Sequence, residues 1–299
     1  MARILLTADW HIRGDAPACR INPDNWKYEQ KRSIAQLIPI AQKCDEMWIL
    51  GDLFHRARTS TEATVATLSM LSRFDGLPIR VLPGNHDLLE HSINNLECST
   101  IGNVFYMENI VQLESHDTAD GLHVEAYPFG MEPDVIPDCD IWCTHQLVFP
   151  DDKARPMPDC GLIAQDLVNM CPNAKFILTG DYHHGYDVTI GNTTVVACGC
   201  LNIQVSDMAD YTPRCYILDT KTMSVEVVLL QTYGEVSSIS ASRDDLELNI
   251  YKEGLPRIAI PRLDYVTNAE NAAALENNNA VKEEVHSILR EYVPNTTKE

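Results

Sequence analysis

Short apolar runs alternate with longer amphipathic stretches over the first 180 residues of the chain. A run of about five apolar residues bounded by turn residues is typical of a buried strand, whereas apolar residues three and four positions apart are typical of a helix. On this basis we predict strands at 3–7, 47–50, 79–82, 141–144 and 175–179, and helices at 26–43 and 61–74. This alternation predicts a layered α/β domain.

The pattern changes after Gly185, where apolar runs are separated by turn residues and not by helices. We predict four more strands, at 187–190, 193–197, 215–218 and 225–230, which would complete a second sheet. Apolar residues at helical spacing predict a helix at 269–293, which ends before Pro294. Its apolar face fits a partner's coiled coil and its own domain equally well. We expect a main domain over 1–232 and a small C-terminal accessory region over 233–299.

Polar residues follow five of these strands directly. Asp9 and His11 come after the first strand, and Asp52 comes after the second. In open α/β sheets the loops at the carboxyl ends of the strands gather along one edge, where ligands bind. We therefore expect seven such residues to converge in space: Asp9, His11, Asp52, Asn85, His145, Asp181 and His183.

These residue types favour divalent metal ions. Asp9 and His11 are two positions apart, so their side chains point to the same face and can bind one ion together. Asp52 adds a carboxylate that can bridge two ions, and Asn85 adds an amide oxygen. A nitrogen and oxygen ligand set without a thiolate favours Mn²⁺, with Mg²⁺, Fe or Zn²⁺ as alternatives. Two ions about 3.5–4 Å apart are suited to hydrolysis of a phosphate ester.

The motifs, taken in order, resemble a known family. Asp-x-His at 9–11, Gly-Asp-Leu-Phe-His at 51–55 and Gly-Asn-His-Asp at 84–87 are similar to the calcineurin-like metallophosphoesterases. Within that family they resemble the bacterial SbcD nuclease and the meiotic-recombination nucleases. The resemblance covers roughly residues 1–220 and implies a four-layer αββα sandwich with a small C-terminal appendage. Where the family has Gly-His-x-His, this chain has Gly-Asp-Tyr-His at 180–183, a form that resembles bacteriophage relatives.

The resemblance also implies a role for each matching residue. One ion would be held by Asp9, His11 and His183, with Asp52 as the bridge to a second ion on Asn85, His145 and Asp181. His86 would act as an acid or charge stabiliser, oriented by Asp87. His55 would contact the substrate phosphate or position the end of its strand.

Several residues have a second interpretation from the sequence. His184 could replace His183 as a ligand, although the alternation of side chains favours His183. Arg13, Arg56 and Arg58 follow metal ligands and could contact phosphates, or serve only solubility. Trp10 could stack on a base, but core packing is the simpler interpretation. The Cys-Gly-Cys at 198–200 is best explained as structural.

Charge and composition set limits on the function. The formal net charge is −20, which argues against a protein that binds nucleic acid unaided. Residues 1–80 carry 11 Lys/Arg and 9 Asp/Glu, whereas the rest carry 12 and 34, so basic residues concentrate near the first motifs. No apolar stretch approaches the roughly 18 residues of a membrane span. The ten scattered cysteines are expected to be free thiols of a cytoplasmic protein, in a bacterium or an infected host cell.

The leading hypothesis is a Mn²⁺-dependent DNA exonuclease or endonuclease of DNA repair or recombination, working with a coiled-coil ABC-type ATPase that supplies part of the DNA grip. A homodimer is compatible with it. One alternative is a phosphodiesterase that acts on cyclic or linear nucleotides, which would suit the acidic surface. Another is a weakened scaffold subunit in which Asp181 has impaired one ion site.

Overall fold

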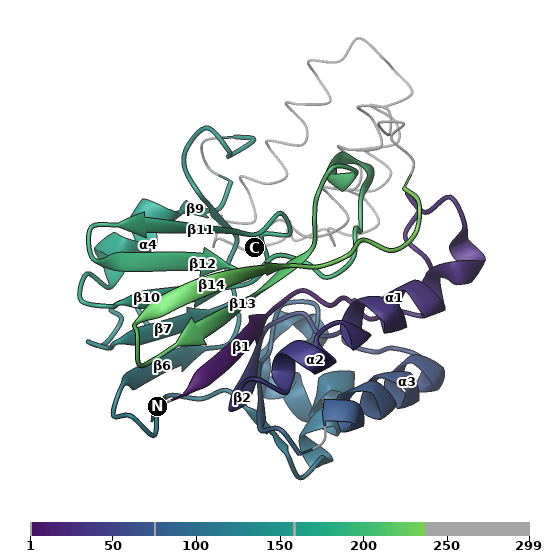
Figure 1. Cartoon of the computed structure of the whole chain (residues 1–299), viewed down its shortest axis with the longest axis horizontal. Coiled ribbons are helices and arrows are strands. Elements are labelled where there is room, and N and C mark those ends of the chain that lie inside the picture. Colours follow the sequence, from purple (N-terminus) through teal and green to yellow (C-terminus); the bar gives the residue numbers. More distant parts are fainter. Residues whose placement is uncertain (1, 75, 158–159, 237–299) are drawn as a thin grey trace, which may run out of the picture. The chain divides into compact units, whose positions relative to one another are not determined.

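Two six-stranded sheets pack face to face in the computed structural model, which describes residues 2–74, 76–157 and 160–236 (Figure 1). In the first sheet the four N-terminal strands are parallel and the last two strands of the described chain extend it in antiparallel fashion. Its order is β14 (Ser224–Leu229), β13 (Arg214–Asp219), β1 (Arg3–Thr7), β2 (Glu46–Leu50), β3 (Ile79–Leu82) and β4 (Ile110–Gln112).

The second sheet has a parallel centre and an antiparallel strand at each edge. Its order is β11 (Tyr186–Ile190), β12 (Thr193–Ala197), β10 (Phe176–Thr179), β7 (Ile141–Thr144), β6 (His123–Tyr127) and β5 (His116–Asp117). A separate two-stranded sheet pairs β8 (Val148–Phe149) with β9 (Leu162–Ile163).

The alternation of side chains along β1 shows how the layers are built. Ile4 and Leu6 pack against the second sheet through residues such as Cys143 and Leu178. Leu5 points the other way, into a core that includes Ile34. Because successive side chains of a strand face opposite sides, one apolar strand serves both cores.

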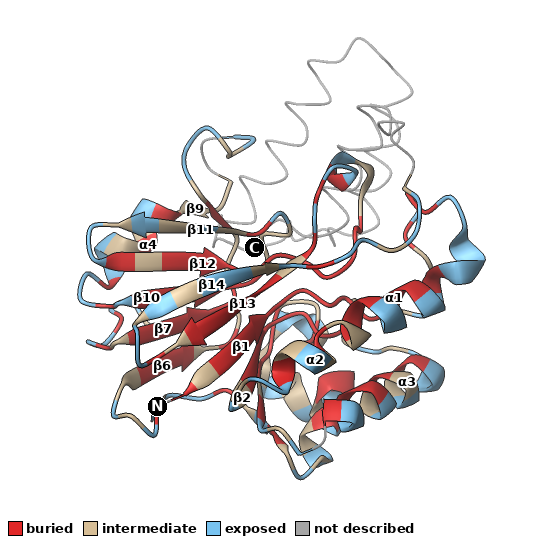
Figure 2. Cartoon of the chain, viewed as in Figure 1, coloured by how far each residue is buried: buried red, intermediate tan, exposed pale blue. Residues whose placement is uncertain are grey.

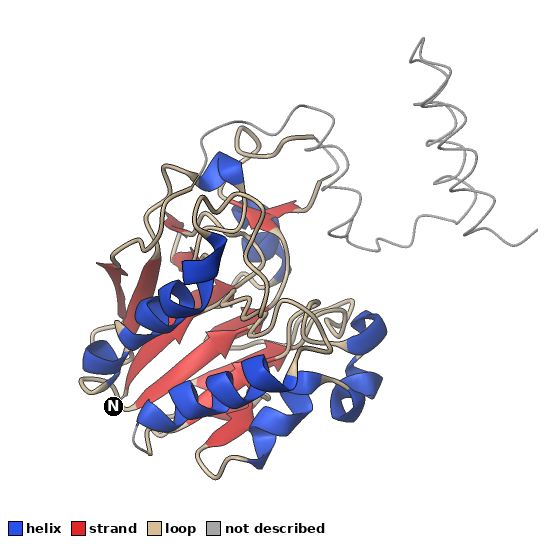
Figure 3. Cartoon of the chain, turned by 90° about the vertical axis from the view of Figure 1, so that its right-hand side faces the viewer, coloured by secondary structure: helices blue, strands red, loops and turns tan. Residues whose placement is uncertain are grey.

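Helices complete the outer layers. The first sheet is covered by α1 (Trp26–Ala35), α2 (Ile38–Ala41) and α3 (Thr61–Leu71), and the second by α4 (Ala164–Met170). Figure 2 shows buried residues along the strands and exposed ones on the outer sides of the helices, and Figure 3 shows helices flanking the sheets. The order helix, sheet, sheet, helix confirms the expected αββα sandwich.

Three expectations about elements need correction. The helix predicted at 26–43 is two helices, because Pro39 lacks an N–H group and the chain at Gln36 and Leu37 turns with tighter hydrogen bonds instead. The strands predicted at 215–218 and 225–230 exist but join the first sheet, since β13 pairs with β1. Helix α4 and strands β4, β5, β6, β8 and β9 were not predicted, and most of these are only two or three residues long.

Other predictions fall outside what the structure covers. The helix at 269–293 and nearly all of the accessory region at 233–299 lie outside the described residues. Among the described residues, none belongs to a helix that is both long and apolar enough to cross a membrane.

Candidate metal centre

The loops that follow β1, β2 and β3 in one sheet meet the loops that follow β7 and β10 in the other. Backbone hydrogen bonds join the first two loops, from Asp9 N–H to Gly51 O at 3.0 Å and from His11 N–H to Asp52 O at 2.9 Å. Across the sheets, Asp181 N–H donates to Asp9 Oδ1 at 3.1 Å. The polar loops therefore converge as expected, but on an edge shared by two sheets.

His145 lies at the centre of this edge and is fully buried. Its Nδ1 is 2.8 Å from the carbonyl oxygen of Leu50, and because a carbonyl only accepts, Nδ1 carries the proton. The other nitrogen, Nε2, is 3.1 Å from Asn85 Oδ1 and 3.5 Å from Asp52 Oδ2. Fixing the tautomer through the far nitrogen is the usual way in which a protein presents an imidazole lone pair to a metal.

Three glycines make room for this imidazole. A Cβ atom on Gly180 would lie 2.6 Å from His145 Nδ1, and one on Gly84 would lie 2.8 Å from Nε2. Gly51 has φ +98°, and a Cβ there would also collide with the His145 ring. The Gly that begins each motif thus permits the close approach of three loops to one ring.

His11 and His183 form a second part of the centre. Their Nε2 atoms are 2.9 Å apart, and His11 Nε2 is 3.6 Å from Asp52 Oδ2. With Asp9 they form one of the groups of side chains able to hold an ion. His184 is exposed and its ring contacts Tyr182 and Tyr211 instead. The geometry therefore favours His183 over His184.

Four of the proposed ligands adopt a backbone conformation that is rare outside glycine. Positive φ values occur at Asp9 (50°), His11 (44°), Asp52 (52°) and Asp181 (68°). Such residues cost on the order of 1–3 kcal/mol each and cluster at functional sites. The strained backbone conformations therefore occur at residues whose side chains belong to the centre.

The charges of the centre fit divalent cations. Asp9 Oδ2 and Asp52 Oδ2 are buried and lack a hydrogen-bond partner among the described residues. Burial, together with Asp52 and Asp181, raises the pKa of Asp9 well above its ordinary value. Burial acts in the same direction on Asp52, but His145, His86 and His11 outweigh it and lower its pKa. Unpartnered carboxylate oxygens that repel one another are stabilised by a bound cation.

Asp181 occupies a distinct place. Burial raises its pKa, and His145 opposes that shift, so its carboxylate is electrostatically coupled to the centre. Its side chain is nevertheless absent from the three groups of potential ligands among the described residues. Their members are Asp9, His11, Asp52, His55, His86, His145 and His183. Of the seven predicted ligands, it is the one whose carboxylate the structure does not bring into a group.

His86 is held at the rim. Its Nδ1–H donates to the backbone oxygen of His55 at 2.9 Å, and its N–H donates to Asp52 Oδ1 at 2.9 Å. Burial lowers the pKa of His86, but Asp52 and the His55 carbonyl outweigh burial and raise it. Nε2 is left as the nitrogen that can exchange a proton.

The expected role of Asp87 needs correction. Its two carboxylate oxygens accept buried backbone N–H groups of Leu53, Phe54 and Gly84 at 3.2, 2.8 and 3.1 Å. Asp87 therefore joins the second and third loops, while the carbonyl of His55 orients His86.

His55 completes a group of three imidazoles. Its ring is stacked on His86 at a centroid distance of 5.4 Å and lies 5.4 Å from His11. Burial and the nearby Arg13 lower its pKa to about 3, so it is neutral at pH 7. A neutral imidazole can donate a hydrogen bond to a phosphate but supplies no charge.

The remaining candidates lie around the centre. Arg13 donates to the carboxylate of Asp15, and Arg56 is 3.8 Å from the same group. Arg58 is exposed. Trp10 is fully buried and its Nε1–H donates to Thr7 Oγ1 at 3.0 Å, which places it in the core.

The thiols of Cys198 and Cys200 are also buried. Burial raises the pKa of both well above the ordinary value, as structural cysteines require.

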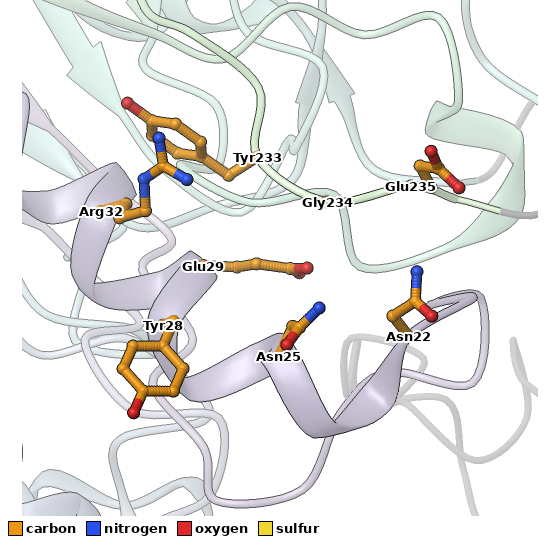
Figure 4. Close-up of a pocket in the computed structure, with 8 residues that line it drawn as sticks. All are labelled: Asn22, Asn25, Tyr28, Glu29, Arg32, Tyr233, Gly234 and Glu235. Atoms are coloured by element: carbon orange, nitrogen blue, oxygen red, sulfur yellow. The ribbon is translucent and has the colours of Figure 1, made fainter.

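A separate pocket of about 520 Å³ lies between α1 and the segment around Gly234 (Figure 4). The Glu29 carboxylate points into it, and Gly234 approaches so closely that a Cβ would collide with that carboxylate. Its lining residues are Asn22, Asn25, Tyr28, Glu29, Arg32, Tyr233, Gly234 and Glu235. None of them belongs to the centre.

A double-sheet sandwich with carboxylates, an amide and imidazoles at the ends of its parallel strands defines a metallophosphoesterase. The chain belongs to the calcineurin-like phosphoesterase family, whose model matches residues 2–183. Members of this family use divalent metal ions.

Comparison with solved structures finds TT1561 of Thermus thermophilus, at 15% identity over 77% of this chain and 99% of the other, with a TM-score of 0.47. A structure described as a novel archaeal phosphodiesterase is 14% identical over 76% and 99% of the two chains, with a TM-score of 0.43. None of the curated proteins compared matches the sequence.

Proposed function

We propose that the chain is a metal-dependent nuclease that hydrolyses phosphodiester bonds of DNA at this centre, with Mn²⁺ as the preferred ion. The observation that carries the proposal is the position of Asp52. It is a fully buried carboxylate within 3.6 Å of imidazole nitrogens from both sheets, and one of its oxygens has no hydrogen-bond partner among the described residues. Such an oxygen is suited to bridging two cations.

The residues divide into two ion sites as the family pattern implies. On that pattern, Asp9, His11 and His183 would hold one ion and Asn85, His145 and Asp181 would hold the other, with Asp52 available to both. When bound, two divalent ions supply the positive charge that activates water and neutralises the phosphoryl oxygens.

His86 acts as the general acid that protonates the leaving oxygen. Its Nδ1–H is engaged with the His55 carbonyl, so a proton for the leaving oxygen comes from Nε2. The raised pKa of His86 keeps more of it in the protonated form near neutral pH, as a general acid requires. His55, stacked on this ring, restricts its rotation.

The nuclease proposal is supported by the Gly-Asp-Leu-Phe-His form at 51–55, which supplies His55 beside His86. Few basic side chains near the centre are available to bind DNA, and this bears on the proposal. Because Arg13 and Arg56 share the carboxylate of Asp15, they offer little charge to a DNA backbone. We therefore propose a partner, a coiled-coil ABC-type ATPase, that supplies part of the DNA grip. The ten cysteines are all free, which fits a reducing cytoplasm.

The acidic charge of the chain favours a second candidate function. A phosphodiesterase for cyclic or linear nucleotides needs no extended basic surface, and the net charge of −20 suits a small substrate better than a duplex.

The experiment compares labelled DNA with bis-p-nitrophenyl phosphate, using full-length protein and Mn²⁺. Cleavage of both by the wild type, and of neither by Asp52→Asn, supports the nuclease. Hydrolysis of the small ester without any cleavage of single- or double-stranded DNA, also with the ATPase present, contradicts it. No hydrolysis of either substrate supports a scaffold.

A further inference from the structure

Four aromatic rings form a row beside the metal centre. Phe149 contacts Tyr182 at a centroid distance of 5.1 Å, Tyr182 contacts His184 at 5.7 Å, and His184 contacts Tyr211 at 5.9 Å. The contacts at both ends are edge-to-face, and the central pair is tilted by 39°. The four residues come from three segments far apart in the sequence, so the row is a product of the fold.

The row is fixed at its ends and accessible in its middle. Phe149 and Tyr211 are buried, whereas Tyr182 is partly exposed and His184 is exposed. Tyr211 O–H donates to the carbonyl of Cys200 at 3.2 Å, and this anchors one end. Tyr186 adds a further edge contact to Tyr182 at 5.7 Å. Ring contacts restrict the motion of Tyr182 and His184, so an accessible flat group could pack on them without a large loss of side-chain entropy.

The middle of the row adjoins the ion ligands. Tyr182 stands between Asp181 and His183 in the chain, and consecutive Cα atoms are about 3.8 Å apart. The turn that carries it is tied down, since Gly185 N–H donates to Tyr182 O at 3.3 Å and Cys200 N–H donates to His183 O at 3.0 Å. Tyr182 and His184 therefore lie on the same short turn as His183, a member of the metal centre.

The charge of the protein makes an uncharged contact valuable at this position. The chain carries 23 Lys/Arg against 43 Asp/Glu. A carboxylate also lies near the row, because Asp151 adds to the effect of burial in raising the pKa of Tyr182. Phosphate contacts by basic side chains are the usual source of affinity for nucleic acid. The guanidinium of Arg214 lies over the Tyr211 ring, 5.7 Å from its centroid, at one end of the row. Stacking of a base on an aromatic face needs no positive charge.

We propose that Tyr182 and His184 form a stacking platform for an unpaired nucleobase of the substrate whose phosphate lies at the metal centre. This inference rests on the proposed phosphodiesterase function and narrows its substrate to unpaired nucleotides, because a paired and stacked base presents no free face. The base would stack on Tyr182 and His184, the two accessible rings. The buried rings of Phe149 and Tyr211 contact these two residues and hold them in position. Stacking involves no ion pair, so the affinity for substrate should depend less on salt concentration than the affinity of proteins that bind phosphates through basic residues.

The test uses two esters with the same leaving group, the p-nitrophenyl ester of thymidine 5′-phosphate and methyl p-nitrophenyl phosphate. The measured quantity is the ratio of their kcat/KM values in Mn²⁺. Base stacking is worth about 1–3 kcal/mol, so Tyr182→Leu and His184→Leu should each lower this ratio about tenfold. Tyr182→Phe keeps the aromatic ring, so its ratio of kcat/KM values should stay near that of the wild type. Tyr106→Leu, a change at an 89% exposed aromatic residue outside the row, is the matched control.

A second measurement does not depend on turnover. Fluorescence anisotropy of a labelled phosphorothioate oligothymidylate, titrated with full-length protein, should show the same losses of affinity in the two Leu variants. An unchanged ratio and unchanged affinity in both Leu variants overturn the platform, whatever the activity of the wild type. Failure of the wild type to hydrolyse either ester contradicts the proposed function, and the anisotropy result then decides on the platform alone.

Discussion

The Nε2 atoms of His11 and His183 lie 2.9 Å apart, although 172 residues separate them in the chain. One follows a strand of the first sheet and the other follows a strand of the second. Two imidazole nitrogens at this distance compete for one proton, and burial with neighbouring imidazoles lowers the pKa of His183 to about 4. Both rings are therefore neutral at pH 7 and offer lone pairs to a common ion.

Divalent metal should stabilise the protein, because the cation neutralises repelling carboxylates in the folded state only. At one hundred times its Kd, a single bound ion adds about 2.7 kcal/mol to the free energy of unfolding. For a chain of this size that corresponds to a rise in Tm of roughly 4 °C. Calorimetry with Mn²⁺ and with EDTA measures it, and equal Tm values in the two conditions would contradict a metal centre.

Asp9→Asn should stabilise the metal-free protein while weakening metal binding. The raised pKa of Asp9 means that its ionised form is unfavourable in the folded state above pH 4, and an amide removes that charge while Oδ1 still accepts from Asp181 N–H. We expect the free energy of unfolding in EDTA to rise by on the order of 1 kcal/mol. The Mn²⁺-induced rise in Tm should shrink. The exposed Asp24→Asn is the control. Urea denaturation in EDTA gives the free energy of unfolding, and calorimetry with and without Mn²⁺ gives the change in Tm.

His86→Gln should affect substrates according to their leaving groups. An alkoxide leaves with a proton from His86, whereas p-nitrophenolate leaves without one. We expect kcat on an oligonucleotide to fall by about 10²-fold or more and kcat on bis-p-nitrophenyl phosphate to fall much less. His123→Gln, on strand β6, serves as the control. Equal losses on both substrates would indicate that His86 does not act as the acid.

Gly84→Ala should destroy the centre through sterics alone. Its Cβ would collide with Asp52 and lie 2.8 Å from His145 Nε2. We expect a loss of about 1–3 kcal/mol in stability and no Mn²⁺-induced rise in Tm. Gly14→Ala is a matched control, since a Cβ there has its closest contact, to Ser60 Oγ, at 3.5 Å. A normal Mn²⁺ response in Gly84→Ala would contradict the geometry of the centre.

Asp87→Ala tests the corrected role of that carboxylate. Three buried N–H groups lose their acceptor, and we expect the free energy of unfolding to fall by about 2–4 kcal/mol. If Asp87 served chiefly to orient His86, activity would fall while stability in urea stayed near that of the wild type.

Asp181→Asn tests how far the unusual ligand is used. Asparagine tolerates the φ of +68°, so the turn is retained while the charge is lost. We expect one of two Mn²⁺ ions to bind about tenfold more weakly, with a smaller loss than in Asp52→Asn. Isothermal titration calorimetry resolves the two ions, and unchanged affinity of both would remove Asp181 from the ligand set.

Local patterns in the sequence were enough to predict the strands that carry the centre. The strands at 3–7, 79–82, 141–144 and 193–197 have the predicted bounds, because short apolar runs ended by Gly, Asp or Asn have few other structures open to them. These patterns also identified which loops would meet, since each polar motif stands at a carboxyl end of a strand. The family follows from the order of those motifs.

Features that depend on contacts between distant segments could not be predicted from local patterns and became visible in the folded chain. Strand β13 joins the first sheet because its partner is β1, at the opposite end of the described chain, and periodicity carries no information about partners. Asp87 binds the backbone of Phe54 instead of His86, and Arg56 approaches Asp15, because neighbouring loops bring these groups within reach. The aromatic row was missed for the same reason. The Tyr between Asp181 and His183 was visible in the sequence, but its supports, Phe149 and Tyr211, come from other loops that only folding places beside it.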